Sequence, residues 1–427
     1  MKDLKGKKLL VLGDTYSTIG VIQIAKQLGI YTVVTGIHPN GDARIFADES
    51  IMIPSDDHES LIHYIKEARI DGVMTGASEF QIQNMILLCA KAGLPVYATK
   101  EQWDICQDKS SFKQLCRNYD VSVVPEYVIG SVLKDEDFPV IVKPSDGCSA
   151  RGLFVCHNNE ELRAAEIEAR KQSPTGRILI EHYIQNGGRT MSAKYIVVNG
   201  NYYLEIISDR YVMDNGKVTA FVEYPSAYSD LHLKKVNPHI QEMFQSIGIE
   251  NGVISLQEIP ENDNIYLHEM CLRITGGMVY KITDAVGNGN ALEMLIHYAL
   301  TSEMCEEKDV RLIDARINGK SAASLSIPLR EGRISSIENF DPIEVLNNVV
   351  DVTTYYHIGD TITEDKIGSL DQLFARIIVV ADSRKEMYET YRGIRNSLSI
   401  KDTNGDNMII WDTFDRIYDD FTAKTKY

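Results

Sequence analysis

The chain has 427 residues, of which 44% are hydrophobic and 25% charged. That is the composition of an ordinary globular protein, and it excludes an intrinsically disordered chain, a collagen-like repeat and a disulfide miniprotein. The net charge of −17 argues against non-specific binding to nucleic acid or to an anionic membrane. An anionic nucleotide can still bind where a few lysines and backbone amides converge on one site.

The seven cysteines are odd in number and scattered, and no two form a C-x-x-C pair. We therefore expect neither a disulfide framework nor a structural zinc site. The basic start of the chain is followed by only four apolar residues before Gly13, which is too short for the core of a signal peptide. No apolar run approaches the roughly 18 residues of a membrane span. These features predict a cytoplasmic protein in a reducing compartment, with no membrane partner.

Residues 7–98 alternate between strand and helix patterns. Continuous apolar or β-branched runs predict buried parallel strands at 8–13, 31–35, 50–54 and 72–75. Helical patterns lie between them: one ends at Leu28, and the others cover 58–68 and 80–92. This βαβ rhythm predicts a doubly wound α/β sheet. The first βα turn, 13–20, is not G-x-G-x-x-G. A structural or substrate-side role for this Rossmann-like unit is therefore favoured over nicotinamide binding.

The pattern of elements changes twice along the rest of the chain. Residues 101–303 mix hairpins with helices, and the chain beyond about 310 is β-rich, with strand candidates at 322–327 and 375–380. A capping box, Ser383-x-x-Glu386, then opens a helix. We expect a fold of mixed α/β and α+β class in three domains, covering 1–100, 101–308 (in two lobes, about 101–183 and 184–308) and 309–427.

A lysine followed by a loop of small residues is the first candidate binding feature. Pro139–Pro144 predicts a short buried strand with Lys143 near its end, the loop 145–152 follows, and 153–155 predicts a second strand. Backbone N–H groups of such a loop can lie against phosphate oxygens, with the lysine as a point charge. A flexible hairpin beside a surface lysine is an equal alternative.

Two further segments are compatible with nucleotide binding. Lys109 stands near the start of a predicted helix, where the macrodipole disfavours a cation, so an anionic neighbour would explain it. A solvent-facing lysine is the commoner explanation. The segment 177–184 predicts a strand whose end can offer backbone groups to an adenine edge. The alternative there is a buried strand that simply ends at a loop.

A predicted hairpin brings together side chains that suit a metal ion. Gln257 and Glu269 each lie six residues from Asp263, so a hairpin centred there pairs them on one face, and Cys271 and Arg273 continue that face. An amide oxygen, a carboxylate and a guanidinium suit Mg²⁺ bound to triphosphate beside an anion clamp. The alternative is a solvated hairpin face.

Taken in chain order, these features resemble the ATP-grasp superfamily, especially its biotin carboxylase and carbamoyl phosphate synthetase branch and the bacterial L-amino acid ligases. The resemblance covers essentially the whole chain. It implies a Rossmann-like pre-ATP-grasp domain, a two-lobed ATP-grasp domain and a biotin-carboxylase-like C-terminal domain. It also implies these ATP-binding residues: Lys109, Lys143, Ser145, Gly147, Ser149, Arg151, Gly152, Glu181, His182 and Ile184.

The resemblance assigns a role to each group. Lys109 and Lys143 would contact the α- and β-phosphates, and the loop 145–152 would be a mobile lid. Glu181 would lie beside the adenine amino group, with backbone contacts from His182 and Ile184. The metal ligands would be Gln257 and Glu269, binding Mg²⁺ or alternatively Mn²⁺. Arg273 would steady the transferred phosphoryl group, acting with Lys143 in catalysis, and the candidate substrate contacts are Arg210, Ser226, Gly276 and Gly277.

Departures from the family pattern narrow the expected chemistry. Cys271 replaces an asparagine, so a second Mg²⁺ loses a hard oxygen ligand. Gly277 replaces the catalytic glutamate of biotin carboxylases, and 321–327 shows no arginine, so biotin carboxylation is not expected.

The resemblance then implies a ligase that joins a small carboxylate to an amine through an acyl-phosphate, with a homodimer as its assembly. A bicarbonate-activating enzyme, favoured by Gln257, and a nucleotide-binding regulator, suggested by Cys271, remain alternatives.

Overall fold

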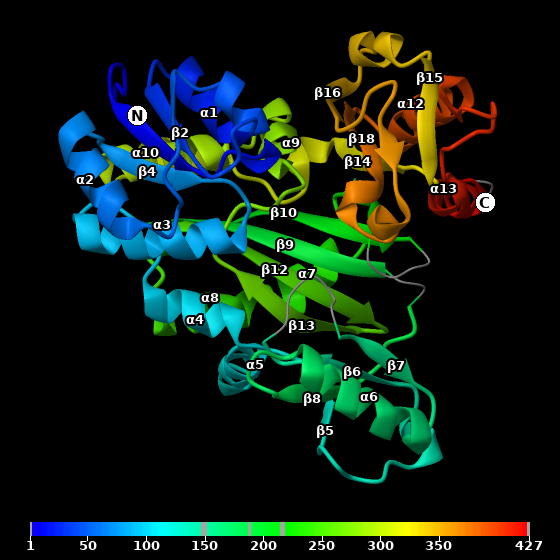
Figure 1. Cartoon of the computed structure of the whole chain (residues 1–427). Coiled ribbons are helices and arrows are strands. Elements are labelled where there is room, and N and C mark those ends of the chain that lie inside the picture. Colours follow the sequence, from blue (N-terminus) through cyan, green and yellow to red (C-terminus); the bar gives the residue numbers. More distant parts are fainter. Residues whose placement is uncertain (1, 147–151, 187–188, 214–217, 425–427) are drawn as a thin grey trace.

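The computed structural model describes residues 2–146, 152–186, 189–213 and 218–424. The first region forms a parallel sheet in the order β3-β2-β1-β4, as the βαβ rhythm predicts; its strands are β1 (Lys8–Leu12), β2 (Tyr31–Thr35), β3 (Glu49–Ile51) and β4 (Gly72–Thr75). Helices flank this sheet (Figure 1), namely α1 (Ile19–Gln27), α2 (His58–Ala68) and α3 (Glu79–Ala92). The doubly wound α/β prediction is confirmed here.

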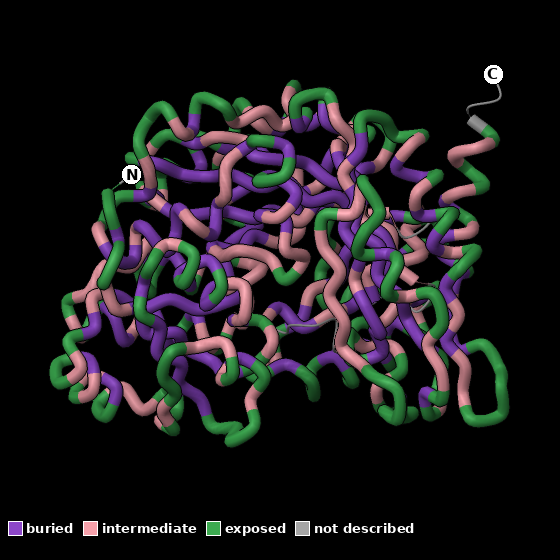
Figure 2. Tube along the Cα trace, turned by 90° about the horizontal axis from the view of Figure 1, so that it is seen from above, coloured by how far each residue is buried: buried purple, intermediate pink, exposed green. Residues whose placement is uncertain are grey.

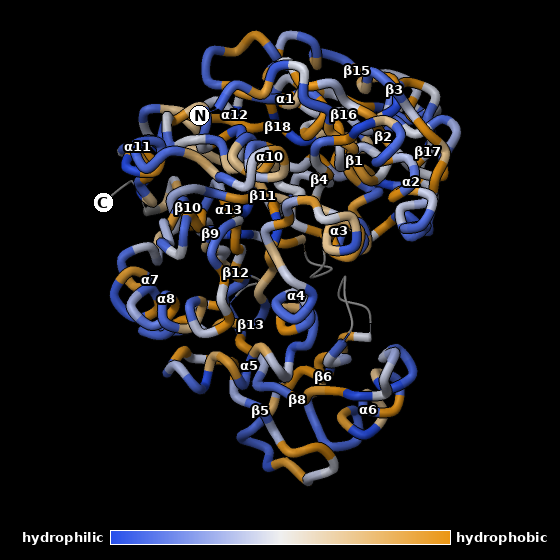
Figure 3. Tube along the Cα trace, turned by 90° about the vertical axis from the view of Figure 1, so that its left-hand side faces the viewer, coloured by the Kyte–Doolittle hydropathy of each residue, from blue (hydrophilic) through white to orange (hydrophobic). Residues whose placement is uncertain are grey.

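A small antiparallel sheet forms a separate lobe, which lies below the main sheet in Figures 1 and 3. Its order is β5-β8-β6-β7, with β5 (Glu126–Tyr127), β6 (Val140–Pro144), β7 (Phe154–Cys156) and β8 (Ile178–His182). Helix α6 (Asn159–Gln172) packs on it through a buried apolar cluster that includes Val142, Leu162 and Ile180. The lobe is preceded by α4 (Lys100–Gln107) and α5 (Lys109–Asn118).

The central element is an eight-stranded sheet in the order β13-β12-β9-β10-β11-β14-β18-β16. Its strands are β9 (Arg189–Val198), β10 (Asn201–Val212), β11 (Thr219–Tyr224), β12 (Gly252–Glu261), β13 (Asn264–Cys271), β14 (Ser321–Pro328), β16 (Val349–Thr354) and β18 (Leu373–Ala381). The strands expected at 322–327 and 375–380 are confirmed. Because β14 pairs with β11, one sheet crosses the break expected near 308, so the domain division itself stays a prediction.

The C-terminal region closes with a small sheet and two helices. The sheet has the order β17-β15-β19, formed by β15 (Gly332–Glu338), β17 (Thr361–Ile362) and β19 (Ser399–Asp402). Helices α12 (Arg384–Ser397) and α13 (Asp412–Lys424) complete it. The Ser383 hydroxyl accepts the Glu386 N–H at 3.2 Å and caps α12, as predicted, whereas the Glu386 carboxylate accepts a hydrogen bond from Asn348.

The remaining helices connect these sheets. They are α7 (Ser229–Lys235), α8 (Asn237–Ser246), α9 (Val279–Ala285), α10 (Ala291–Thr301), α11 (Glu307–Val310), and the short 3-10 helices η1 (Tyr16–Thr18), η2 (Asp42–Ile45), η3 (Asp135–Asp137), η4 (Ile317–Gly319), η5 (Asp341–Val345), η6 (Glu364–Lys366) and η7 (Leu370–Gln372). No helix in the described ranges is long and apolar enough to cross a membrane.

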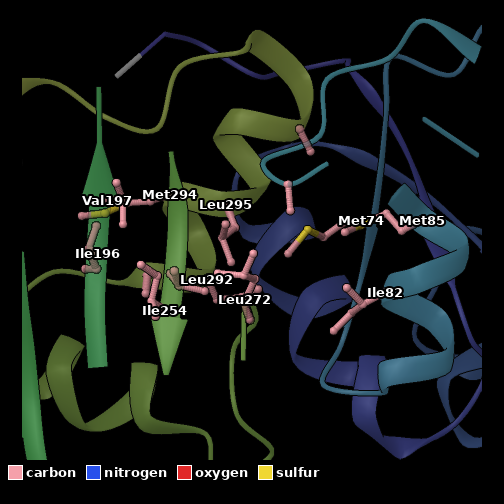
Figure 4. Packing of buried hydrophobic residues seen from close by; sticks show 14 of the residues in the cluster. Met74, Ile82, Met85, Ile196, Val197, Ile254, Leu272, Leu292, Met294 and Leu295 are labelled. Carbon is pink, nitrogen blue, oxygen red and sulfur yellow. The ribbon is translucent and has the colours of Figure 1, made fainter. Parts of the chain in front are cut away.

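Helix α10 joins the first region to the central sheet, although the two lie far apart in sequence. It packs against α1 and β4 on one side and β12 on the other. Figure 4 shows Leu292 and Leu295 between Ile254 and Met74, within one continuous apolar core. In Figure 2, buried segments form the interior of the molecule and exposed segments form its edge. This core fixes the N-terminal region relative to one face of the central sheet.

The two faces of the central sheet differ in chemistry. Ser192 pairs with Gln257 and Ser208, and Lys194 pairs with Ser255, so these side chains share one face, here called the polar face. The opposite face carries Tyr195, whose ring lies 5.7 Å from that of Phe244 on α8. The apolar face is therefore covered by helices, and the polar face is available for a site.

Candidate nucleotide and metal site

A buried carboxylate holds two lysines at the small sheet. Glu181 on β8 is 2% exposed and accepts hydrogen bonds from Lys113 Nζ at 2.5 Å and Lys143 Nζ at 2.6 Å. The β6–β8 register makes Lys143 a diagonal neighbour of Glu181, because Ile141 is its direct partner. Burial alone would raise the pKa of Glu181, but Lys143 and Lys113 outweigh it and hold the pKa at about 2. The carboxylate is thus ionised and fixes both cations.

This arrangement differs from the role expected for Glu181. The resemblance placed its carboxylate beside an adenine amino group, whereas the structure gives both oxygens to lysines. Lys113 was not singled out from the sequence, although it lies one helical turn after Lys109 on α5 and therefore shares a helix face with it. That i,i+4 spacing is the signal that could have identified it.

Lys109 lies at the start of α5, as predicted, and next to the small-residue loop. The Asp108 side chain caps the helix by accepting the Ser111 N–H at 2.8 Å. The Lys109 N–H donates to the Ser145 carbonyl at 3.3 Å, which joins the helix start to the start of the loop. The Ser145 hydroxyl is buried, with no hydrogen-bond partner among the described residues.

The far end of that loop is sterically constrained. Gly152 has φ +71°, and a Cβ there would lie 2.7 Å from Gln172 Cβ, so only glycine fits without strain. The expectations for Gly147, Ser149 and Arg151 fall outside the described residues.

The predicted hairpin is present, and Gln257 pairs with Glu269 as expected. The turn itself is tighter than predicted, because Glu261 pairs with Asn264 and Asn262 adopts φ +52°. A β-bulge then shifts the register: Glu258 pairs with Leu267, so His268 is the extra residue. The predicted pair is therefore correct, although a bulge is required to produce it.

The bulged residue, His268, belongs to the same cluster. Burial lowers the pKa of its imidazole to about 3, and the positive charges of Lys143, Arg210 and Lys109 act in the same direction, against Glu181. The ring is therefore neutral at physiological pH. Alternation alone did not reveal this residue, because a bulge is not visible in a period-2 pattern.

Two arginines flank the Gln257–Glu269 pair. Arg210 donates to Gln257 Oε1 and to Thr219 Oγ1, each at 3.1 Å, so the structure brings this candidate into the site. Arg273 forms an ion pair of 3.0 Å with Glu79, at the start of α3. Arg273 Nε is buried and has no hydrogen-bond partner in the described ranges. It remains able to bind an anion or a neutral acceptor.

The donor atoms at this point fit a divalent cation. Glu79, Glu269 and Cys271 offer ligand atoms within 4.8 Å of one another, and Gln257 pairs with Glu269. Hard cations such as Mg²⁺ prefer the oxygens. Burial raises the pKa of the Cys271 thiol to about 12, so it is a poor ligand. Glu79, which follows the carboxyl end of β4, was not predicted and is an additional oxygen donor.

The remaining substrate candidates lie in two separate places. The Gly276 carbonyl accepts from Arg376 Nη1 at 2.5 Å, and Arg376 comes from β18. Gly277 is the next residue. A Cβ added there would lie 3.9 Å from the nearest atoms of Thr275 and Val279, so a larger residue would fit. Ser226 instead donates to Asp209 at 2.6 Å. Asp209 pairs with Met191, which places that contact on the apolar face, away from the site.

The backbone contacts expected from β8 are partly unavailable. The His182 N–H donates to the Pro125 carbonyl at 2.9 Å, so it is already bonded within the fold. Ile184 is 7% exposed and contributes mainly apolar contact. The backbone contacts expected from His182 and Ile184 stay a prediction, which falls to groups other than the bonded His182 N–H.

Several known proteins are similar to this chain in sequence. A family model described as the D-ala D-ala ligase C-terminus matches residues 109–248. The 2-oxoglutarate carboxylase small subunit of Hydrogenobacter thermophilus is 29% identical over 363 residues, covering 74% of this chain and 72% of that protein. The carbamoyl phosphate synthase large chain of Clostridium botulinum is 22% identical over 303 residues. That match covers 65% of this chain but only 28% of the synthase.

Solved structures share the fold over nearly the whole chain. The L-amino acid ligase from Bacillus licheniformis superposes with a TM-score of 0.75 at 17% identity, covering 93% of this chain and 99% of that one. Phosphoribosylglycinamide synthetase from Anaerococcus prevotii gives 0.72 at 18% identity, with 93% and 100% covered. These superpositions show that the chain shares the fold of both enzymes. The family model, these relatives and the solved structures together indicate an ATP-grasp ligase.

Proposed function

We propose that the protein is an ATP- and Mg²⁺-dependent ligase that joins a carboxylate to an amine and releases ADP and phosphate. One observation supports this most directly. The pair Gln257–Glu269 lies on the polar face between Arg210 and Arg273, close to the lysines that Glu181 orients. Oxygen donors beside converging cations are suited to a metal-bound polyphosphate.

The site residues would act mainly by positioning and neutralising charge. Lys109 and Lys143 would hold the polyphosphate, and His182 and Ile184 would border the base. Mg²⁺, held by Gln257 and Glu269, would neutralise charge on the phosphates. Arg273 would stabilise the phosphoryl group as it passes from ATP to the substrate carboxylate.

The reaction would then proceed through an acyl-phosphate. An amine attacks its acyl carbon, an amide forms, and phosphate leaves. No nucleophilic side chain is required for either step.

A screen of small carboxylates paired with amines, scored by ADP, phosphate and product mass, tests this function. We expect equimolar ADP, phosphate and amide for at least one pair. Glu269→Ala should lower turnover by at least about 100-fold, because a metal ligand is lost. Asp263→Asn, in the exposed turn of the same hairpin, is the matched control and should be unaffected. ADP release that never yields an amide, or turnover that survives Glu269→Ala, would refute the proposal.

A bicarbonate-activating enzyme is the second candidate. It is favoured by the amide of Gln257 at the metal pair and by the similarity to carbamoyl phosphate synthase large chains. This reaction predicts ADP release that depends on bicarbonate and needs no other carboxylate. ADP release that is independent of bicarbonate, together with amide formation, would exclude it.

A homodimer is the assembly we propose. One solved neighbour, the biotin carboxylase domain of 2-oxoglutarate carboxylase, is described as a dimer. Light scattering should give twice the chain mass of 48.1 kDa. A mass equal to that of one chain would refute this assembly.

A further inference from the structure

A small buried cavity lies beside the metal site, between the polar face and helices α9 and α10. Its charged lining residues are Lys194, Glu205 and Arg273. Ser255, Thr275 and Tyr280 add polar groups, and the other walls are apolar residues of β12, α9 and α10 and of the loop before α9. The space available to the centre of a water-sized group is about 20 Å³. That is room for one small polar group. None of the proposed metal or phosphate contacts except Arg273 borders it.

Glu205 is directed into this cavity by an irregularity in the sheet. Leu204 pairs with Tyr195 and Ile206 pairs with Lys194, so Glu205 is the extra residue of a β-bulge. Bulges commonly re-aim a side chain beside an active site. Glu205 is 3% exposed, and its Oε1 has no hydrogen-bond partner among the described residues. A buried acceptor without a donor is unfavourable, so a ligand that donates a hydrogen bond to it would be stabilised.

The charges around the cavity set what it can bind. Lys194 is 9% exposed and donates to Ser192 Oγ at 3.0 Å. Arg273 offers its unpartnered Nε from the side of the metal site. Burial raises the pKa of Glu205 to about 7, against the attraction of Lys194 and a hydrogen bond with the Thr283 side chain. Burial also lowers the pKa of Lys194 to about 8.

We propose that this cavity receives the amino group of the amine substrate and that Glu205 accepts a proton from it. This inference rests on the ligase function proposed above. An amino group is a hydrogen-bond donor and would satisfy Glu205 Oε1. The small volume admits ammonium or an unbranched primary amine and excludes a secondary amine.

The proton balance explains why the ligase needs this group. An ammonium ion has no lone pair, so it must first transfer one proton to the Glu205 carboxylate. The free amine then forms the N–C bond to the acyl carbon beside Arg273. The C–O bond to the phosphate breaks, and phosphate leaves with that electron pair. The second N–H proton passes to the departing phosphate, which completes the amide.

Hydroxylamine separates the two stages of the reaction. It is largely uncharged at neutral pH, so it traps an acyl-phosphate as a hydroxamate without a protein base. In Glu205→Gln, we expect amide formation from ammonium or methylamine to fall by at least about 100-fold, the usual effect of losing a general base. Hydroxamate formation should stay within about threefold, and the loss of amide formation should lessen as pH rises. Asp263→Asn should leave both reactions unchanged.

Three results would overturn the inference. Amide formation by Glu205→Gln at the wild-type rate would show that Glu205 accepts no proton. In the wild-type protein, dimethylamine reacting as fast as methylamine would show that the cavity does not receive the amine, and this measurement does not depend on how the variant folds. Absence of hydroxamate in the wild type with every carboxylate would refute the ligase itself, and this inference with it.

Discussion

Replacing Glu181 with glutamine should expose how strongly one carboxylate holds the two lysines. The amide keeps the shape of the side chain, so packing is preserved while the charge is lost. Lys113 is fully buried and would keep Glu126, 3.0 Å away and 23% exposed, and the Val124 carbonyl, to which it donates at 3.2 Å. The drop in the pKa of Glu181 from 4.5 to about 2 corresponds to about 3 kcal/mol. The free energy of unfolding should fall by about that amount at pH 7, near the lower end of what breaking a buried ion pair costs.

The pH dependence gives a second test of the same ion pairs. Because the folded pKa lies below the unfolded one, the stabilisation by Glu181 is fully present above about pH 4.5 and is lost as pH falls toward 2. At pH 3 the difference between wild type and Glu181→Gln should shrink to about 1 kcal/mol. Urea unfolding followed by circular dichroism at pH 7 and pH 3 measures both values. A difference that stays constant between the two pH values would refute the reasoning.

Two controls separate charge from packing. Glu126→Gln removes the more exposed partner of Lys113 and should cost only about 1 kcal/mol. Combining Glu181→Gln with Lys113→Met removes the uncompensated charge, so the double variant should recover part of the loss. The explanation fails if Glu181→Gln unfolds at the same urea concentration as the wild type. It also fails if the double variant loses more free energy of unfolding than the two single variants lose together.

Three further changes have defined outcomes. Cys271→Asn adds an oxygen donor near Glu269 and should lower the Mg²⁺ concentration needed for ATP binding by about threefold to tenfold in calorimetry; unchanged affinity would contradict the metal assignment. Asn158→Ala removes the cap of α6 and should cost about 1 kcal/mol in urea unfolding, whereas no loss would show that the cap is dispensable. His232→Phe removes the donor, 3.1 Å away, of the fully buried Glu258 and should cost about 3 kcal/mol. A loss below about 1 kcal/mol would show that this buried contact contributes little to stability.

The sequence identified those parts of the fold and site that depend on local periodicity. Apolar runs predicted the parallel strands of the first region, and alternation placed Gln257 opposite Glu269. Lys109 was found because a cation at a helix start is unfavourable, and the structure confirms that position. These inferences succeed because each depends only on residues within one strand, one turn or one helix.

The contacts that were missed depend on bulges or on distant segments. Glu205 and His268 enter the site through one extra residue in a strand, which leaves no trace in a period-2 pattern. Glu79 reaches Arg273 across 194 positions in sequence, and Arg376 reaches Gly276 across 100. Such contacts follow from how sheets and helices pack, and a single sequence does not specify that packing.

The strongly acidic net charge is compatible with a polyphosphate site because electrostatic fields in salt are short-ranged. At physiological ionic strength a charge on the far surface is screened beyond about 8 Å. A bound nucleotide would therefore be attracted mainly by the cations of the site itself. Lys109, Lys143 and Arg210 lie close enough to His268 to lower its pKa, and Arg273 interacts electrostatically with Glu269. Raising the salt concentration should then weaken nucleotide binding only modestly, because these cations are largely buried. A steep loss of ATP affinity with salt would show instead that exposed surface cations hold the nucleotide.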